Sequence, residues 1–588
     1  MRVAVSQFAT SSNAQENLAT CIRMINKVAV CQPALIVLPE YCNTLFCHTL
    51  PCYSDHNQAW HEALIIDGPF MHTIAEQAKK HNCYIVLNVT LRRSGAGDLL
   101  KAPQNAVIKR NISITSCLFS PLGELVHQED KQTLVGREND FFMYRSHQLG
   151  EAKTSFGKLG LLAGNDTMTF ETPRKFALQG AQLLCHSMSS FAIDQSELYD
   201  RARACENKVF LAAANKVGAL ASTGAIVGEG QSQIVSPQGK VLAKIDHKEE
   251  GFVFADIELA EAEIPAHNKR RPDGTELFKQ RRPELYQGLT QPMHQQVNNP
   301  SNKLPETANV AIFATYKSNE EAIEDVCFYI ENNLSDIIQL PELFFIADKK
   351  ITHHTEQLVE IECLSEQLIK QISSVLRPFQ YVCTSLVIEG AHQAVLISEH
   401  GLFAKQQQLH FCQRYLWTSL GDALTIVELP LEQGNINVAM LTADDANIPE
   451  IVKVAALNNA HLLLVPFEIQ EPGEVEYCLL SRAAEHRICI VAASREQSFP
   501  DDLSTDSLST DGGQYNTQNN TQNNNKDKNK TKSKKSTGLI VNLTKDFAFL
   551  TSSEFGRLNG YINQPLVKYQ YGKITKAVIH PITACTKH

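Results

Sequence analysis

One pattern of segments occurs twice in this chain of 588 residues, and it limits the possible folds more than any other feature. Its first copy is a strand at residues 2–8, a helix at residues 13–30 and an apolar strand that ends in Pro39-Glu40. Its second copy runs from a strand at residues 309–315 through a helix to Pro341-Glu342. Because self-similarity over such a length marks a repeated folding unit, the sequence predicts one module used twice.

Composition suggests where the two modules begin and end. Residues 291–307 form a polar stretch rich in Gln, Asn and Pro, which is typical of a linker. We therefore expect one domain at residues 1–290 and a second at residues 308–588. Within the second domain, residues 498–536 are mostly Ser, Thr, Asp, Asn, Gln and Lys, a composition that cannot bury a core and predicts a disordered surface insertion.

Strands alternate with helices along the first module. The continuous apolar run at residues 34–38 predicts a strand that is covered on both faces. Helices are expected at residues 70–81 and 173–179, and a hairpin is expected at residues 112–119 and 125–129. The alternation indicates an α/β fold, and the hairpin indicates a mixed sheet.

Composition also limits location and partners. The chain has no run of about 18 apolar residues and starts directly in a strand, so we expect a cytoplasmic protein with no membrane partner. The formal net charge of -10, without a basic stripe, argues against nucleic acid as a partner.

The 16 cysteines are scattered through apolar runs and are interpreted as reduced core thiols. The group Cys42, Cys47, His48 and Cys52 has the composition of a metal site. It lacks a CxxC pair, however, so a loop that lines a pocket is favoured over a zinc site.

Residues that could take part in catalysis lie where strands end. The strand at residues 159–163 breaks at Gly164 into a polar turn, a junction that often presents a nucleophile but here holds glycine. Glu40 ends one strand and Lys131 follows the hairpin. If they meet, the carboxylate could act as a base and the ammonium could stabilise an oxyanion. They could also form a partly buried ion pair, and spacing alone favours this second interpretation.

Several motifs carry a resemblance to a known family. They are LPEY at residues 38–41, DKQTL at 130–134, GLLAGND at 160–166, RACEN at 203–207 and RRPELY at 281–286. With these motifs the chain resembles a tandem of two carbon-nitrogen hydrolase domains of the nitrilase superfamily. The resemblance covers almost all of residues 1–290 and is weaker in the second module.

The resemblance implies two αββα sandwich domains of nitrilase type that pack together as an intramolecular pseudo-dimer, and homo-oligomerisation stays open. It also implies that a Glu, Lys and Cys triad cuts a non-peptide C–N bond through a thioester. Carried over by position, Glu40 is the general base and Lys131 stabilises the oxyanion, while Glu138, Asn165 and Asp166 bind substrate. The implied ligand is a small amide, nitrile or carboxylate, and no metal or cofactor is expected.

The nucleophilic cysteine is absent from both modules. Gly164 occupies its position in the first module and Ala443 in the second, where Gln408 at the lysine position also removes the cation. Loss of a covalent nucleophile costs on the order of 10⁶ in turnover, so we expect a ligand-binding pseudoenzyme. Two alternatives stay open: an amidohydrolase that uses Cys185 or water activated at Glu40, and a scaffold in which the second module only supplies an interface.

Overall fold

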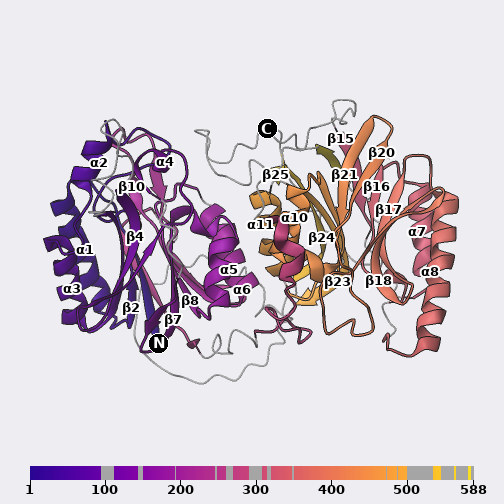
Figure 1. Ribbon diagram of the computed structural model, residues 1–588, viewed down its shortest axis with the longest axis horizontal. Coiled ribbons are helices and arrows are strands. Elements are labelled where there is room, and N and C mark those ends of the chain that lie inside the picture. Colours follow the sequence, from indigo (N-terminus) through magenta and orange to yellow (C-terminus); the bar gives the residue numbers. More distant parts are fainter. Residues whose placement is uncertain are drawn as a thin grey trace, which may run out of the picture.

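A computed structural model gives the structure of the protein. It describes residues 1–93, 111–143, 150–192, 194–245, 248–259, 269–289, 307–313, 319–346, 350–471, 473–486, 488–499, 534–543, 562–563 and 580–583. These residues form four six-stranded sheets in two stacked pairs, with helices on the outer faces of each pair (Figure 1). Each half of the chain is therefore an αββα sandwich, which confirms the predicted fold class.

The outer sheet of the first half is mixed. In the order β14-β1-β2-β3-β4-β5 it contains β14 (Gly251–Asp256), β1 (Arg2–Gln7), β2 (Leu35–Val37), β3 (Tyr84–Arg92), β4 (Ile112–Phe119) and β5 (Leu125–Asp130). The strands β1, β2 and β3 are parallel, and the predicted hairpin β4-β5 is antiparallel. The helices α1 (Ala14–Ala29), α2 (His56–Glu62) and α3 (Pro69–His81) flank this sheet.

The inner sheet of the first half has the order β13-β12-β9-β8-β7-β6. Its strands are β13 (Val241–Lys244), β12 (Gln233–Val235), β9 (Phe210–Ala214), β8 (Leu183–Ser187), β7 (Gly157–Ala163) and β6 (Ala152–Thr154), and β10 (Val217–Ala219) pairs with β11 (Val227–Glu229) beside it. The helices α5 (Glu171–Leu178) and α6 (Asp200–Asn207) cover its outer face. Between the two sheets lies a fully apolar layer that includes Val37, Cys185 and Ala212.

Each sheet of the second half has the same strand order as the corresponding sheet of the first half. One sheet runs β19-β18-β17-β16-β15-β26, with β19 (Gly401–Gln407), β18 (Ala391–Ser398), β17 (Tyr381–Ile388), β16 (Ile337–Gln339), β15 (Thr307–Ile312) and β26 (His580–Thr583). The other runs β20-β21-β22-β23-β24-β25, with β20 (Ile426–Leu431), β21 (Gly434–Met440), β22 (Leu462–Pro466), β23 (Cys489–Phe499), β24 (Lys534–Leu543) and β25 (Ile562–Asn563). Three helices lie on this second sheet: α9 (Ala443–Ala446), α10 (Pro449–Leu457) and α11 (Leu479–His486).

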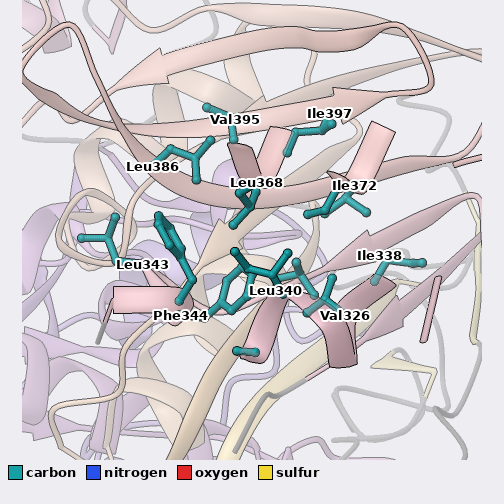
Figure 2. Close-up of a cluster of buried hydrophobic side chains, with 14 of the residues drawn as sticks. Val326, Ile338, Leu340, Leu343, Phe344, Leu368, Ile372, Leu386, Val395 and Ile397 are labelled. Atoms are coloured by element: carbon teal, nitrogen blue, oxygen red, sulfur yellow. The ribbon is translucent and has the colours of Figure 1, made fainter. Parts of the chain in front are cut away.

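The outer core of the second half is formed by α7 (Ala322–Glu331), α8 (Thr355–Val375) and the sheet beneath them. Figure 2 shows Val326 of α7 and Leu368 of α8 close to Ile338 of β16, all without exposed surface. Apolar residues at helical spacing thus meet the continuous apolar face of the sheet, which is the pattern that the repeat predicts.

Two predicted segments fall largely outside the described residues. The linker at residues 291–307 is described only at its last residue, where β15 begins. Of the insertion at residues 498–536, only the ends are described, and they are strands: Ser498 pairs with Lys535 and Phe499 with Lys534. The ladder of β23 and β24 therefore continues into the predicted insertion at both ends, because strand pairing satisfies backbone groups whatever the polarity of the side chains.

The two halves contact each other through helices. In Figure 1, α5 and α6 face α10 and α11 across the middle of the molecule. At the centre, Arg203 Nη2 of α6 lies 2.9 Å from Glu485 Oε2 of α11, and Arg482 Nη2 of α11 lies 3.4 Å from Glu206 Oε2 of α6. The two contacts are reciprocal, and all four side chains are buried.

Among the described residues, every helix is too short or too polar to traverse a lipid bilayer.

Candidate functional site

Glu40, Lys131 and Glu138 meet where β2, β5 and β7 end. The Lys131 ammonium donates to Glu40 Oε1 at 2.9 Å and to Glu138 Oε1 at 2.6 Å. All three side chains are at most 3% exposed. The sequence-predicted base, cation and second carboxylate therefore form one buried cluster in which the ammonium bridges two carboxyl groups.

The Glu138 carboxylate is fixed by two further donors. Glu138 begins α4 (Glu138–Phe141), and the Val135 backbone N–H donates to its Oε2 at 2.9 Å. The Tyr41 hydroxyl donates to Oε1 at 2.5 Å. Glu138 therefore acts as a fixed anchor for the Lys131 ammonium.

The electrostatics of the cluster separate the roles of Glu40 and Lys131. Burial raises the pKa of Glu40 to about 7, although the charge of Lys131 opposes the rise. Burial disfavours the charge of Lys131, but the two carboxyl groups outweigh it and raise the pKa of Lys131 above its ordinary value. Lys131 is therefore a permanent cation, while Glu40 can gain or lose a proton near neutral pH, as a general acid or base requires.

Gly164 lies against this cluster at the start of the 3₁₀ turn η1 (Gly164–Thr167). Its φ of +48° is a left-handed conformation that glycine adopts without strain. A Cβ atom built on Gly164 would overlap the Lys131 ammonium and lie 2.7 Å and 2.9 Å from the two Glu40 carboxylate oxygens. The ion pair thus occupies the place into which a side chain at this position would project.

Asn165 and Asp166 follow in the same turn and are buried. The Asp166 carboxylate accepts the backbone N–H groups of Gln132 at 3.0 Å, Thr133 at 2.7 Å and Ala163 at 3.1 Å. These bonds tie the loop that carries Lys131 to the turn at Gly164, which is a positioning role. The substrate contacts predicted for Asn165 and Asp166 stay predictions.

His186 and Asp200 support the turn and were missed by the sequence analysis. His186 Nε2 lies 2.7 Å from the Gly164 carbonyl, to which it donates, and His186 Nδ1 lies 2.9 Å from Asp200 Oδ1. Asp200 raises the pKa of His186 although burial opposes this. The position of His186 at the end of β8, one strand from β7, was the available signal.

Cys185 precedes His186 on β8 and points to the opposite face. Its side chain is completely buried in the apolar layer between the two sheets, and burial raises the pKa of its thiol. Because neighbouring residues of a strand face opposite sides, the thiol and the cluster at Gly164 are separated by the sheet. The alternative in which Cys185 supplies the nucleophile therefore loses its geometric basis.

The loop with Cys42, Cys47, His48 and Cys52 makes packing contacts. Cys52 Sγ accepts the Cys47 backbone N–H at 2.9 Å, and the His48 ring stacks on Phe191 at a centroid distance of 5.3 Å. Within the described part of the chain, the three side chains whose ligand atoms come close enough to hold a metal ion are Asp273, Cys412 and Asp444. Asp444 is already paired with an arginine, so we assign no metal to that group.

The equivalent place in the second half is recognised by its backbone bonds. The Asp445 carboxylate accepts the N–H groups of Leu409 and His410, as Asp166 accepts those of Gln132 and Thr133. This match places Gln408 at the position of Lys131.

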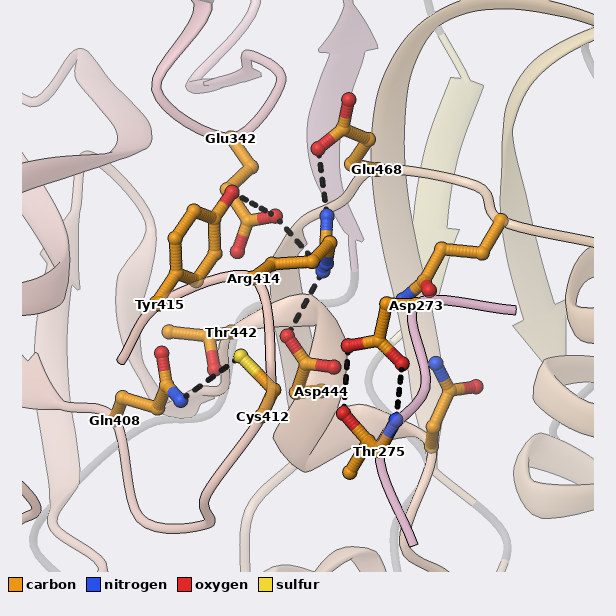
Figure 3. A network of polar contacts seen from close by, with 12 residues as sticks. Asp273, Thr275, Glu342, Gln408, Cys412, Arg414, Tyr415, Thr442, Asp444 and Glu468 are labelled. Atoms are coloured by element: carbon orange, nitrogen blue, oxygen red, sulfur yellow. Dashed lines mark hydrogen bonds and ion pairs between the residues drawn. The ribbon is translucent and has the colours of Figure 1, made fainter. Parts of the chain in front are cut away.

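The expectation that Gln408 leaves the second half without a cation is wrong, because Arg414 supplies one (Figure 3). Its Nη2 lies 3.3 Å from Glu342 Oε2 and 2.8 Å from Asp444 Oδ2, and its Nη1 lies 2.6 Å from Glu468 Oε2. A guanidinium can contact several carboxyl groups at once through its planar array of donors. An arginine at another position of the loop can therefore take the place of the lysine.

Sequence comparison relates the first half of the chain to known proteins. The carbon-nitrogen hydrolase family model matches residues 2–263. A probable nitrilase of Schizosaccharomyces pombe is 29% identical over 229 residues, which cover 38% of this chain and 76% of that protein. The omega-amidase of Mus musculus is 26% identical over 296 residues, which cover 48% of this chain and 96% of that protein.

Among solved structures, a mutant of the Nesterenkonia AN1 amidase from the nitrilase superfamily covers 49% of this chain and 97% of its own, with 21% identity and a TM-score of 0.38. By the family model and the two relatives, residues 2–263 form a carbon-nitrogen hydrolase domain.

Proposed function

We propose that the site around Glu40 is a carbon-nitrogen hydrolase site that has lost its nucleophile and binds a small amide, nitrile or carboxylate. The observation that carries the proposal is the position of Gly164, where the Glu40 and Lys131 side chains converge on the space of an absent side chain. Every other charged group of the cluster is in place, with Glu138 holding Lys131. Without a thiol, no thioester forms at this position, so hydrolysis by the covalent route is lost.

The cost of keeping the cluster supports a role in ligand binding. Three ionisable groups are buried there, and a buried ion pair usually gives a protein less stability than apolar residues of the same volume would. A site that served only the fold would gain by replacing them. A ligand with a polar carbonyl or carboxylate group, which Lys131 could contact, gives a reason to keep them.

We further propose that the chain is a duplication, with domains at residues 1–290 and 308–588, and that the second half is the built-in dimer partner of the first. Two observations support this. The strand orders of the sheets correspond, and the contacts from Arg203 to Glu485 and from Arg482 to Glu206 are reciprocal, as in an interface with two-fold symmetry.

A second candidate is an amidohydrolase that activates water at Glu40. The observation that favours it is the pKa of Glu40 at about 7, which suits a general base at neutral pH. In this reaction Glu40 takes a proton from water, the hydroxide adds to the amide carbon beside Lys131, and the proton passes to the leaving amine.

The test is ammonia release from a panel of simple amides and nitriles. The variants are Gly164→Cys, Gly164→Ala, Glu40→Gln and Cys185→Ala. Gly164→Ala is the matched control, because it introduces the same Cβ overlap and the same strain at positive φ without a thiol.

A disarmed hydrolase site predicts a silent wild type, activity in Gly164→Cys, and loss of that activity when Glu40→Gln is added. Gly164→Ala should stay silent. Turnover by the wild type that Glu40→Gln abolishes and Cys185→Ala leaves unchanged would establish the water mechanism instead. Turnover that survives Glu40→Gln would contradict both candidates.

A further inference from the structure

The second half contains a partly open cavity with a largely polar lining, at the place that corresponds to the site of the first half. Its volume is about 190 Å³, which holds about six water-sized groups at ~30 Å³ each. Its polar lining consists of Glu342, Lys350, Arg414, Tyr415, Glu468 and Arg495. The family model ends at residue 263, so this cavity lies outside the matched domain.

The carboxylates of the lining are largely engaged with protein cations. Glu468 accepts from Arg414 through Oε2 at 2.6 Å and from Arg495 through Oε1 at 2.7 Å. Glu342 Oε2 accepts from Tyr415 at 3.1 Å and lies 3.3 Å from Arg414. A bound cation would therefore have to compete with two guanidinium groups for the same oxygens.

The donors at the mouth of the cavity are less engaged. Arg495 uses Nη2 for Glu468, and its other nitrogens bond to none of the described residues. The Lys350 side chain is exposed, and its ammonium pairs with no carboxylate among the described residues. Arg495 itself is 20% exposed at its side chain, so both cations can reach a molecule that enters from solvent.

One carboxyl oxygen on the wall also has no hydrogen-bond partner among the described residues. Glu342 is only 2% exposed, and its Oε1 has no hydrogen bond within the described part of the chain. His392 Nε2 lies 3.5 Å from this oxygen, but it already forms a hydrogen bond with Ser385 Oγ at 2.9 Å. A buried polar atom without a partner is costly. A water could satisfy it, and a protonated Glu342 could donate from this oxygen to an entering carboxylate.

The remaining wall is apolar and comes from Leu343, Ile346 and Ile351. We propose that this cavity binds a small organic carboxylate with a short aliphatic chain. The carboxylate would lie at Arg495 and Lys350, and the chain would lie against the three aliphatic side chains. This inference does not depend on the activity proposed for the first half.

The charge state of Glu342 should control the affinity. Burial raises the pKa of Glu342 to about 8, so at pH 7 the group is mostly protonated and adds no negative charge to the cavity. The charged and titratable groups that face it are Arg414 and Tyr415 of the loop after β19, Asp444 of α9, Glu468 after β22 and His392 of β18. Above pH 8 the ionised Glu342 should repel an anion.

The experiment uses the full chain and three probes of similar size: butyrate, butyramide and butylammonium. Binding is followed by saturation-transfer NMR and quantified by titration. The variants are Arg495→Gln and Lys350→Gln, with Lys405→Gln as the matched control, because Lys405 pairs with Glu389 on the surface and does not line the cavity. Glu40→Gln reports on the first half.

We expect butyrate to bind and the other two probes to bind at least about tenfold more weakly. Arg495→Gln and Lys350→Gln should each weaken butyrate binding by about tenfold, while Lys405→Gln leaves it unchanged. Lys350→Gln keeps the test decisive if Arg495→Gln fails to fold, since Lys350 is on the surface. The affinity of wild type should fall from pH 7 to pH 9, and Glu342→Gln should remove that fall.

Three results would overturn the proposal. The first is no binding of butyrate, and the second is tighter binding of butylammonium than of butyrate. The third is that Glu40→Gln loses butyrate binding while Arg495→Gln and Lys350→Gln keep it. The last result would place the carboxylate in the first half. Absence of ammonia release in every Gly164 variant would refute the proposed function and leave the cavity prediction untouched.

Discussion

Replacing Glu40 with glutamine should stabilise the first half at high pH. The rise of the Glu40 pKa from 4.5 to about 7 means that the folded state disfavours the ionised carboxyl group, even beside Lys131. The contribution of Glu40 to the free energy of unfolding is fully present below about pH 4.5 and is lost as pH rises through 7. The contribution that is lost corresponds to about 3 kcal/mol. Glutamine has the same shape, can still accept from Lys131 and never ionises.

The measurement is urea unfolding at pH 4.5 and pH 8.5, followed by tryptophan fluorescence. The chain has two tryptophans, Trp60 in the first half and Trp417 in the second, so a Trp417→Phe background isolates the first half. At pH 8.5, Glu40→Gln should raise the free energy of unfolding by about 3 kcal/mol, and at pH 4.5 the difference should vanish.

The matched control is Glu76→Gln, at an exposed position of α3, which should change little at either pH. If Glu40→Gln is instead less stable than wild type at pH 8.5, then Glu40 is ionised and its ion pair with Lys131 stabilises the fold. The reasoning about burial would then be wrong, and so would the assignment of Glu40 as a group that titrates near neutral pH.

Three further predictions also use urea unfolding, the first of them with both tryptophans retained. Arg203→Met should cost about 3–5 kcal/mol and separate the Trp60 and Trp417 transitions, because it leaves Glu206 and Glu485 buried without their shared cation; a single unshifted transition would refute this coupling. Gly164→Ala should cost at least about 1–2 kcal/mol, the part due to its positive φ, because the new Cβ also crowds the ion pair; a loss below a few tenths would show that both the turn and the ion pair relax. Asn13→Ala should cost about 1 kcal/mol, since the Asn13 side chain caps α1, and Asn13→Asp should retain that stability.

Much of the fold could be predicted from the sequence. The helix expected at residues 70–81 is α3, and the hairpin expected at residues 112–119 and 125–129 is β4-β5. Both have strong periodicity and clear end signals, such as Pro69 at the start of α3 and left-handed Asn82 at its end. The strand pairing within the insertion at residues 498–536 was missed, because long-range backbone pairing leaves no local mark in a polar sequence.

The sequence could indicate those residues of the candidate site that lie directly at the end of a strand. Glu40 and Gly164 are of this kind, because the ends of neighbouring strands meet in space. The supporting contacts were not predictable. Tyr41 and His186 act through hydrogen bonds to Glu138 and to the Gly164 carbonyl, and these depend on side-chain directions that only the packed structure sets.

Arg414 shows why position alone was a poor guide in the second half. The prediction followed Gln408 and concluded that the cation was lost, yet Asp444 is still buried there and still needs a counter-charge. Removing a lysine from beside a buried carboxylate strongly destabilises a fold unless another cation replaces it. The long side chain of an arginine at another sequence position can place its guanidinium there. The carboxylates therefore constrain the chemistry of the cavity more than the backbone position does, and they keep it a charged cavity although Ala443 offers no nucleophile.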